Sequence, residues 1–437
     1  MARTPTFAPL SIYLNGRHVG QMERSAAGAI NFQYAASWLI WEHALPVSLS
    51  LPLREQRYTG APVTAVFENL LPDNRDIRAR LAGRRGADGT DAFSLLSKVG
   101  RDCVGALQFL PKGEEPQPTG AIDGRPVSDA EVAAILGDLA ANPLGLGDDE
   151  EFRISIAGAQ EKTALLRHNG AWMIPHGTTA TTHILKPPIG IRNDGIDLSL
   201  SAENEHLCLT LLGKLGLPVA RTGVVTFADR KALVVERFDR RWTKDGRLLR
   251  LPQEDCCQAL SVPPDLKYEK DGGPGFQDLA RLFQGSDEPD HDQTLLMKAM
   301  VLFWLLAASD GHAKNFSLFL NPGGGFRMTP LYDVMSVQPV FDAGQLRQNR
   351  VRLAMVVGEG RHYRIDEIVP RHFVETAKLC GIGEKIIKKV IDEIIDRSPV
   401  ALTEAREATA GIVPAALTES ILGGYVTRMK FLTDTAR

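Results

Sequence analysis

The feature that most restricts the fold is a run of ten apolar residues, 299–308 (AMVLFWLLAA), which ends at a polar loop. A helix needs about 20 apolar residues to cross a bilayer, so this shorter run predicts a helix buried in a protein core. The helix would present Asp310, two residues beyond its end, on a rigid support.

The polar loop after this run carries two side chains with a defined spacing. Asp310 and Asn315 lie five positions apart, and Asp333 follows eighteen residues after Asn315. The intervening segments 316–320 and 326–329 are strand-like and are separated by a Gly-rich turn, which predicts a hairpin. Such a hairpin would return Asp333 to the side of Asn315.

These residue types suit the transfer of a phosphoryl group from ATP. Asp310 could orient or deprotonate a hydroxyl, while Asn315 and Asp333 could hold Mg²⁺ against the phosphates. The Asp-x₄-Asn spacing is that of the protein-kinase catalytic loop, although Ala308-Ser309 stands where those enzymes have His-Arg. Two alternatives remain open at this point. Asp-Gly is a common turn dipeptide, and Asp310, His312 and Asp333 could instead hold a metal ion in a hydrolase.

Composition indicates an ordinary globular protein. With 437 residues, 44% hydrophobic and 24% charged, the chain has room for two or three domains. A net charge of −3 does not indicate a nucleic-acid-binding protein. The five cysteines form no CxxC pair, which favours a reducing compartment. The first residues predict a strand at 10–14 and an Asn15-Gly16 turn rather than a secretion signal, so we expect a cytoplasmic protein without a membrane partner.

The order of the predicted elements suggests four regions. Residues 1–110 predict a β-rich subdomain that includes the alternating segment 47–51 as a strand, and residues 111–150 predict a linker and a helix. Residues 151–250 predict a nucleotide-binding lobe. Residues 251–437 predict an all-helical C-terminal lobe that carries the catalytic loop. Its last helices are expected at 384–397 and 415–433. The fold class is therefore α+β, with a bilobal kinase-like core behind an N-terminal module.

The middle region contains a candidate phosphate-binding loop. Small residues at Ala157, Gly158 and Ala159 would let backbone N–H groups approach phosphate oxygens, and Gln160, Glu161 and Lys162 complete the loop. A single Gly158 is also compatible with a simple tight turn between two strands.

Two further elements follow in the order found in kinases. Lys186 ends the short apolar strand 183–186, where kinases keep the lysine that binds the α- and β-phosphates. A strand-end lysine can also be a solvated edge residue. The segment 233–239 then predicts a strand that runs into a polar connector, the place where kinases hold adenine. The metal-hydrolase alternative accounts only for the catalytic loop and Asp333.

Several stretches together resemble the HipA family, the serine/threonine-kinase toxins of bacterial toxin–antitoxin pairs. They are Leu49–Leu53, Glu68–Asp73, Gly100–Ala106, Ser155–Leu166, Val235–Trp242, Leu251–Asp255, Tyr268–Gly275 and Asp310–Ser317. The stretches span nearly the whole chain, so the resemblance concerns the full-length family fold.

The resemblance implies a role for particular residues. Asp310 would be the catalytic base, Asn315 and Asp333 would be the Mg²⁺ ligands, and Lys186 would bind the phosphates. The implied ATP-binding positions are Ala157, Gly158, Ala159, Gln160, Glu161, Lys162, Lys186, Glu236, Arg237, Phe238, His312, Ala313, Lys314, Asn315, Tyr332, Asp333, Val334 and Met335. Ser155 matches the family's autophosphorylation serine, whose modification would eject the phosphate loop. About two added negative charges beside a site for ATP phosphates would repel the nucleotide.

The resemblance also implies partners. Such toxins phosphorylate an aminoacyl-tRNA synthetase, arrest growth, and are restrained by a HipB-like helix-turn-helix antitoxin dimer that carries them to operator DNA. A second functional class stays open, a catalytically silent kinase-like protein that acts mainly as an antitoxin-bound corepressor. Lys385, Lys388 and Lys389 could contact DNA phosphates, but their helical spacing favours a solvated face.

Overall fold

A computed structural model describes residues 7–145 and 154–436 of the chain. The junction between the predicted linker and the predicted nucleotide-binding lobe, 146–153, lies outside the described residues, as do 1–6 and 437. The chain forms two compact units. The first comprises Met1–Pro187, Val225–Asp265 and Leu318–Phe326, and the second comprises Pro188–Val224, Leu266–Ser317 and Arg327–Arg437.

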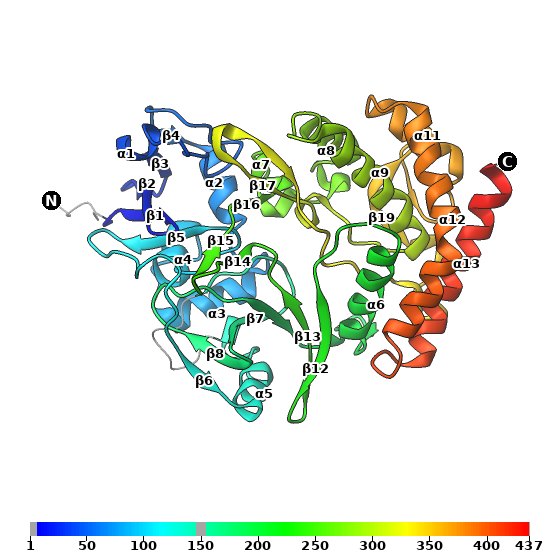
Figure 1. The fold of residues 1–437 in the computed structure, drawn as a ribbon, viewed down its shortest axis with the longest axis horizontal. Coiled ribbons are helices and arrows are strands. Elements are labelled where there is room, and N and C mark those ends of the chain that lie inside the picture. The colour runs from blue at the N-terminus through cyan, green and yellow to red at the C-terminus, as the bar shows by residue number, and fades with distance from the viewer. Residues whose placement is uncertain (1–6, 146–153, 437) are drawn as a thin grey trace. The chain divides into compact units, whose positions relative to one another are not determined.

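The first unit begins with a five-stranded antiparallel sheet in the order β4-β3-β2-β1-β5 (Figure 1). Its strands are β1 (Leu10–Leu14), β2 (Arg17–Arg24), β3 (Ile30–Tyr34), β4 (Tyr58–Thr59) and β5 (Leu107–Pro111). The predicted strand and turn at its start are confirmed. Asn15 and Gly16 adopt φ values of 45° and 80°, the left-handed pair that a two-residue hairpin turn requires.

The predicted strand at 47–51 is wrong, because this segment forms turns instead. Its alternating serines do not face solvent from a strand. The Ser48 and Ser50 hydroxyls both donate to the carbonyl oxygen of Gln258, and Leu51 N–H closes a turn on the Ser48 carbonyl oxygen at 2.9 Å. Serine side chains that compete in this way for backbone groups favour turns over strands.

Four helices accompany this sheet, namely α1 (Ala36–Leu39), α2 (Ala61–Glu68), α3 (Arg75–Arg85) and α4 (Ala92–Val99). Phe67 of α2 packs edge-to-face between Phe32 and Phe109 of the sheet, with ring centroids 5.9 Å and 5.6 Å apart. The sequence also delimits α3. The Asn74 side chain accepts from the N–H groups of Asp76 and Ile77, and Gly86 ends the helix in a left-handed conformation.

A six-stranded sheet in the order β12-β13-β9-β7-β8-β6 carries the candidate nucleotide-binding residues of the first unit. Its strands are β6 (Gly124–Val127), β7 (Thr163–His168), β8 (Ala171–Pro175), β9 (His183–Lys186), β12 (Thr222–Phe227) and β13 (Arg230–Glu236), with α5 (Asp129–Gly137) after β6. β9 lies between β7 and β13 and is antiparallel to both. Its last residue, Lys186, pairs with Leu233 of β13.

The first unit is completed by short elements. They are β14 (Arg240–Trp242), β15 (Leu248–Arg250), β16 (Gln253–Asp255), α7 (Cys256–Ala259), β17 (Ser317–Leu320) and β18 (Phe326–Met328). Ser317 of β17 and the last two residues of β18 are counted in the second unit. β14 and β15 form an antiparallel hairpin, and the other strands form a sheet in the order β16-β17-β18. The predicted hairpin after the catalytic loop is thus confirmed.

Most of the second unit is helical. Its helices are α6 (Ser201–Lys214), α8 (Phe276–Phe283), α9 (Pro289–Leu306), α10 (Gln338–Asp342), α11 (Pro370–Leu379), α12 (Glu384–Ala408) and α13 (Ala415–Ala436). Every residue of α9 from Leu295 to Leu306 is buried, which confirms the predicted core helix. Pro289 in its first turn places the start ten residues before the apolar run.

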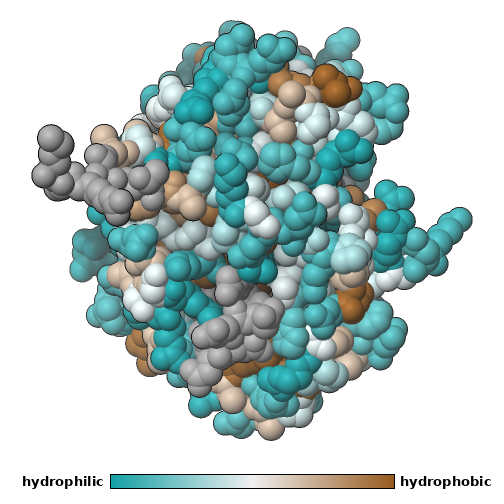
Figure 2. Space-filling model, turned by 90° about the vertical axis from the view of Figure 1, so that its left-hand side faces the viewer, coloured by the Kyte–Doolittle hydropathy of each residue, from teal (hydrophilic) through white to brown (hydrophobic). Residues whose placement is uncertain are grey.

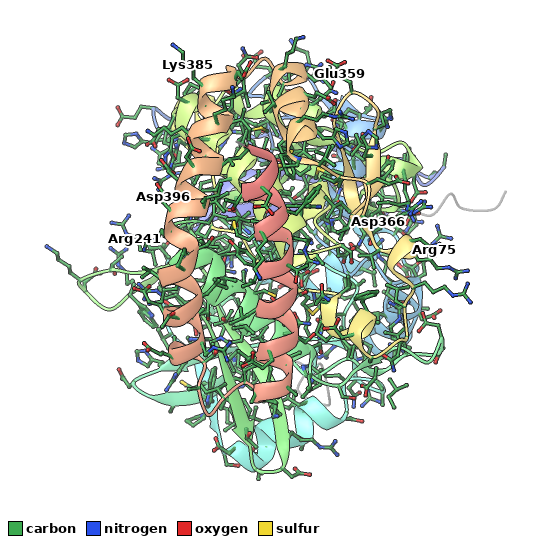
Figure 3. The ribbon with its side chains drawn as sticks, turned by 90° about the vertical axis from the view of Figure 1, so that its right-hand side faces the viewer. Arg75, Arg241, Glu359, Asp366, Lys385 and Asp396 are labelled. Atoms are coloured by element: carbon green, nitrogen blue, oxygen red, sulfur yellow. The ribbon has the colours of Figure 1, made fainter. Side chains whose placement is uncertain are left out.

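The predicted last helices are confirmed, but α12 is longer than expected and continues through Pro399 to Ala408. Ala401 and Ala405, beyond the proline, are buried, and packing of α12 against α6 and α9 outweighs the local cost of Pro399. Figure 3 shows α12 and α13 side by side, with Lys385 pointing outward near one end of α12. Lys388 and Lys389 form surface ion pairs with Glu384 and Glu393, which agrees with a solvated face.

The α+β class is confirmed, with one correction to the C-terminal half. Residues 251–437 are not all helical, because β16 to β18, β19 (Arg352–Val357) and β20 (His362–Arg364) lie there, and β10 (Gly190–Ile191) and β11 (Asp197–Leu198) precede α6. The face shown in Figure 2 is mostly hydrophilic, with small separate hydrophobic patches. Within residues 7–145 and 154–436, no helix has both the length and the apolar character to cross a membrane.

Candidate phosphoryl-transfer site

The catalytic-loop candidate begins where the buried helix α9 ends. Ala307 takes a left-handed φ of 52°, and the N–H of Ala308 returns to the carbonyl oxygen of Phe303 at 2.8 Å. Asp310 follows at the surface. A Cβ on Gly311 would lie 2.5 Å from the Phe303 ring, so close packing requires glycine after Asp310.

The loop is fixed by its own hydrogen bonds. The carbonyl oxygen of Asp310 accepts from the Asn315 side-chain Nδ2 and from His312 N–H, both at 2.8 Å. Because the Asn315 amide uses its nitrogen here, its Oδ1 is the atom that can ligate a cation. One oxygen of the Asp310 carboxylate, Oδ1, accepts from the Tyr268 hydroxyl at 2.7 Å.

Tyr332 joins the second acidic position to this loop. Its hydroxyl donates to the Lys314 carbonyl oxygen at 3.0 Å and lies 2.6 Å from the Ser317 hydroxyl. The next residue, Asp333, adopts φ 59°, a conformation uncommon for a residue with a side chain and frequent at functional sites. Val334 is buried, and Met335 precedes Ser336, which exchanges two 2.8 Å hydrogen bonds with the Asn204 side chain of α6.

These residues suit Mg²⁺ chemically. An amide oxygen from Asn315 and a carboxylate from Asp333 are the hard oxygen ligands that Mg²⁺ takes, usually one or two from the protein with phosphates and waters completing the shell. Among the described residues, no cluster of three His, Cys, Asp or Glu side chains could hold a metal by itself. Asp310, His312 and Asp333, the ligands of the hydrolase alternative, form no such cluster.

The first unit holds the phosphate-loop candidate. Gly158 has φ 109°, and a Cβ there would lie 2.4 Å from the Lys162 Nζ, so no other residue fits without displacement. Lys162 Nζ donates to the Ala157 carbonyl oxygen at 2.9 Å, which closes the loop on itself. Ala159 is exposed between them, and Gln160 Nε2 donates to the Pro187 carbonyl oxygen at 2.9 Å.

The N-terminal module supports this loop from several positions. Gly158 pairs with Pro72 in an isolated β-bridge, and its carbonyl oxygen accepts from Asp73 N–H at 3.1 Å. Arg80 forms an ion pair with Glu161 at 3.1 Å. Ser155, which precedes the loop, is fully buried and donates its hydroxyl to the Leu70 carbonyl oxygen at 2.8 Å.

Lys186 and the connector complete the candidates in the first unit. Lys186 is buried at the end of β9, opposite Leu233 of β13. In the connector, Glu236 is exposed, and Phe238 packs edge-to-face on Phe319 with centroids 5.9 Å apart. The Arg237 side chain, by contrast, is buried in an ionic network and is not available for contact with adenine.

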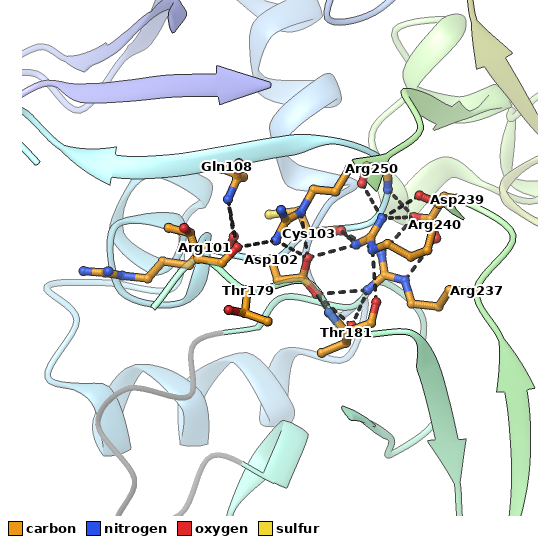
Figure 4. Close-up of polar contacts among 12 residues, drawn as sticks. Arg101, Asp102, Cys103, Gln108, Thr179, Thr181, Arg237, Asp239, Arg240 and Arg250 are labelled. Atoms are coloured by element: carbon orange, nitrogen blue, oxygen red, sulfur yellow. Dashed lines mark hydrogen bonds and ion pairs between the residues drawn. The ribbon is translucent and has the colours of Figure 1, made fainter. Parts of the chain in front are cut away.

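That network surrounds Asp102, a residue that sequence reasoning did not single out (Figure 4). Asp102 and Asp239 are enclosed with the guanidinium groups of Arg237, Arg240 and Arg250, all nearly inaccessible to solvent. Burial alone would raise the pKa of Asp102, but the three guanidinium groups hold it well below its usual range. Asp102 is therefore ionised at every physiological pH.

The candidates fall into two sets. Ser155, Ala157–Lys162, Lys186 and Glu236–Phe238 belong to the first unit, while Asp310, His312–Asn315 and Tyr332–Met335 belong to the second. Within each set, the residues are held in place by the hydrogen bonds and packing contacts described above. Their union into one ATP site stays a prediction. Tyr268 and Asp102 lie in stretches that carry the family resemblance, but no role was predicted for them. Each acts on a partner far away in sequence, 42 positions for Tyr268 and Asp310 and 135 for Asp102 and Arg237.

Comparison with known proteins gives a consistent result. The HipA N-terminal domain family matches residues 10–110, and the HipA-like C-terminal domain family matches residues 154–402. The serine/threonine-protein kinase toxin HipA of Shewanella oneidensis is 28% identical over 408 residues, 90% of this chain and 88% of the relative. Y4mE of Sinorhizobium fredii, a proposed kinase, is 34% identical over 411 residues, 93% of this chain and 94% of the relative.

A solved structure supports the same assignment. Shewanella oneidensis HipA, in a complex with HipB and its operator DNA, matches with a TM-score of 0.82 and 25% identity, and the match covers 98% of both chains. The C-terminal domain family alone covers more than half of this sequence. The chain therefore belongs to the HipA family of kinase toxins.

Proposed function

We propose that this protein is an ATP-dependent serine/threonine kinase toxin restrained by a HipB-like helix-turn-helix antitoxin dimer. The observation that carries the proposal is the loop after α9. There, an exposed Asp310 carboxylate and the Asn315 amide are joined by a 2.8 Å hydrogen bond through the Asp310 carbonyl oxygen. A base and a metal ligand fixed to each other in this way are what phosphoryl transfer requires.

In the proposed mechanism, Asp310 accepts the proton of a serine or threonine hydroxyl. Tyr268 occupies Oδ1, so Oδ2 is the oxygen that would face the substrate. Asn315 Oδ1 and the Asp333 carboxylate would ligate Mg²⁺, which would neutralise charge on the β- and γ-phosphates. The strained φ of Asp333 would be the local cost of aiming its carboxylate at that position.

The nucleotide would be bound by the remaining candidates. Backbone N–H groups of Ala157–Lys162 would cradle the phosphates, since Gly158 lets the backbone approach without a Cβ. Lys186 would pair with the α- and β-phosphates. Backbone groups of Glu236–Phe238 would hold adenine. His312–Asn315 and Tyr332–Met335 would line the other side of the nucleotide.

Ser155 is the proposed site of autophosphorylation. Its hydroxyl is fully buried against Leu70, so a phosphoserine could not occupy the same position. About two negative charges would force this segment out of its place and displace the phosphate loop. Modification would therefore silence the kinase.

The proposed partners follow from the relatives. The Shewanella oneidensis protein was solved with HipB and operator DNA, and we extend both to this chain as an antitoxin complex that represses its own operon. The protein substrate would be an aminoacyl-tRNA synthetase. A silent corepressor is the weaker candidate, because Lys186, Asp310, Asn315 and Asp333 are all intact.

Replacing Asp310 by Asn tests the proposal. Growth arrest on expression and phosphate on the Ser155 peptide, measured by mass spectrometry after incubation with Mg-ATP, should both disappear. Loss of the base should reduce the phosphorylation rate at least about a hundredfold. Asp290→Asn, an exposed carboxylate in the first turn of α9, is the matched control and should behave as wild type.

Antitoxin binding should survive in Asp310→Asn, since the variant removes one exposed charge. If that variant still arrests growth and carries phosphate on Ser155, Asp310 is not the base and the kinase mechanism is wrong. If neither protein is phosphorylated and wild type does not arrest growth, the corepressor alternative replaces the kinase proposal.

A further inference from the structure

Asp102 lies between α4 and β5 in the N-terminal module, and its carboxylate accepts hydrogen bonds from four different residues. Oδ1 accepts from Arg240 Nη2 at 2.9 Å and Arg250 Nε at 3.0 Å. Oδ2 accepts from Thr181 at N and Oγ1, at 3.0 Å and 2.7 Å, and from Arg237 Nη1 at 3.3 Å. Figure 4 shows these groups converging on the one carboxylate.

The backbone of Asp102 holds a different segment, residues 154–156, which leads into the phosphate loop. Ile154 pairs with Asp102 in an isolated parallel β-bridge, and Ser155 N–H donates to the Asp102 carbonyl oxygen at 2.9 Å. Ser155 is two residues before Ala157, the first residue of the loop. The backbone of Asp102 therefore fixes the position of this segment.

One side-chain partner of Asp102, Arg237, belongs to the connector that is proposed to hold adenine. Arg237 is the middle residue of that connector, and its backbone N–H donates to the Thr182 carbonyl oxygen at 2.9 Å. Its guanidinium group also donates to the Cys103 carbonyl oxygen at 2.8 Å. Asp239, two residues later, accepts from Gly105 N–H at 2.7 Å. Residues 102–105 thus hold the connector and Asp239 by several hydrogen bonds.

From these contacts we infer that Asp102 is a positioning residue of the nucleotide site. Its backbone positions the segment before the phosphate loop, and its carboxylate positions the adenine connector through Arg237, so one residue of the N-terminal module fixes the spacing between the two. The inference rests on the proposed function, because the connector and the loop are nucleotide-binding elements only if the chain binds ATP.

Stability alone does not account for such a cluster. Three arginines and two aspartates buried together stabilise a fold no better, as a rule, than apolar residues of similar volume. Ionic networks do fix geometry, because each guanidinium group demands its acceptors in particular directions. This directional property would be useful in a network that joins two segments of a binding site at a fixed spacing.

Thr181→Val is the most informative variant. The Thr181 hydroxyl donates to Asp102 Oδ2 and accepts from Arg237 Nη1 at 2.8 Å, so valine removes that bridge while preserving shape. Asp102→Asn would leave three buried guanidinium groups without their shared carboxylate, and failure to fold would then be uninformative. Thr179→Val is the matched control. It lies in the same segment, is buried, and loses hydrogen bonds with Asp123 N–H and Gln117 Oε1 but none with Asp102.

Two measurements are made on full-length Thr181→Val, Thr179→Val and wild type. Hydrogen exchange should accelerate in residues 154–162 and 236–239 only in Thr181→Val. The KM for ATP should rise about tenfold in that variant with kcat nearly unchanged, since two hydrogen bonds to charged groups are lost. Both variants should show a similar loss of thermal stability.

Unchanged exchange and an unchanged KM in Thr181→Val would overturn the inference, as would equal effects in Thr179→Val. Failure of the proposed function gives a different pattern. In that case wild type shows no ATP turnover, and hydrogen exchange alone decides whether Asp102 positions the two segments.

Discussion

Tyr268 places its hydroxyl 2.7 Å from Oδ1 of Asp310, and its ring packs edge-to-face on His312 with centroids 4.8 Å apart. At the scale of single residues this contact fixes which way the proposed base points. Tyr268→Phe keeps the ring and removes only the donor. We expect kcat for substrate phosphorylation to fall roughly tenfold, the worth of one hydrogen bond to a charged group, with the KM for ATP unchanged.

Steady-state kinetics on the purified variant would check this expectation, with Tyr363→Phe in the same unit as the control. A higher kcat in Tyr268→Phe would mean that the hydroxyl blocks the base instead of orienting it. An unchanged kcat would remove Tyr268 from the mechanism.

Glu254 predicts a pH dependence of stability. It is completely buried, and burial raises its pKa to about 8, although Leu49 N–H donates to Oε1 at 2.8 Å. In the unfolded chain this carboxyl ionises near the ordinary glutamate pKa of 4.5. The folded state therefore binds the extra proton between these values, and the free energy of unfolding must fall as pH rises through that window.

Glu254→Gln removes this titration. Between about pH 5 and about pH 8, wild type should lose more stability than the variant, on the order of a few kcal/mol. Urea unfolding at several pH values measures the difference, and Glu55→Gln, an exposed position, serves as control. Parallel pH profiles for wild type and Glu254→Gln would show that Glu254 is ionised in the folded protein.

At the scale of elements, the local sequence pattern predicted secondary structure correctly where the conformation of a segment depends on its own residues. The ten-residue apolar run could only be a buried helix, and Asn15-Gly16 could only be a tight hairpin turn. The prediction failed where contacts with a distant residue determine the conformation. The alternating pattern at 47–51 is typical of a strand. The segment forms turns instead, because both serine hydroxyls donate to the Gln258 carbonyl oxygen, about two hundred residues away.

The candidate site follows the same division. The catalytic loop and the phosphate loop could be proposed from local patterns because their candidate functional atoms lie within a few residues of one another. Backbone groups of Glu236–Phe238 were predicted to hold adenine, and this stays a prediction. The Arg237 side chain belongs to the Asp102 network through contacts that span more than a hundred positions. No local pattern in the sequence contains that pairing, so the support of the site could not be predicted.

At the scale of the whole molecule, the proposed ATP site depends on both units at once. Lys186 belongs to the first unit, and Asp310, Asn315 and Asp333 belong to the second. If one nucleotide is bound by both sets, Mg-ATP must stabilise both, because a ligand lowers the free energy of every state that holds it. Hydrogen exchange should therefore slow in 157–162 and also in 310–315 and 332–335.

Lys186→Ala should abolish this protection in the second unit as well, although Lys186 is not part of it, since the phosphates would lose a principal cation. Lys244→Ala, an exposed lysine of the first unit, should leave the protection intact. Protection confined to the first unit in wild type, or protection of 310–315 that survives Lys186→Ala, would show that the two sets do not share a nucleotide. The catalytic loop would then need a phosphate donor bound by the second unit alone.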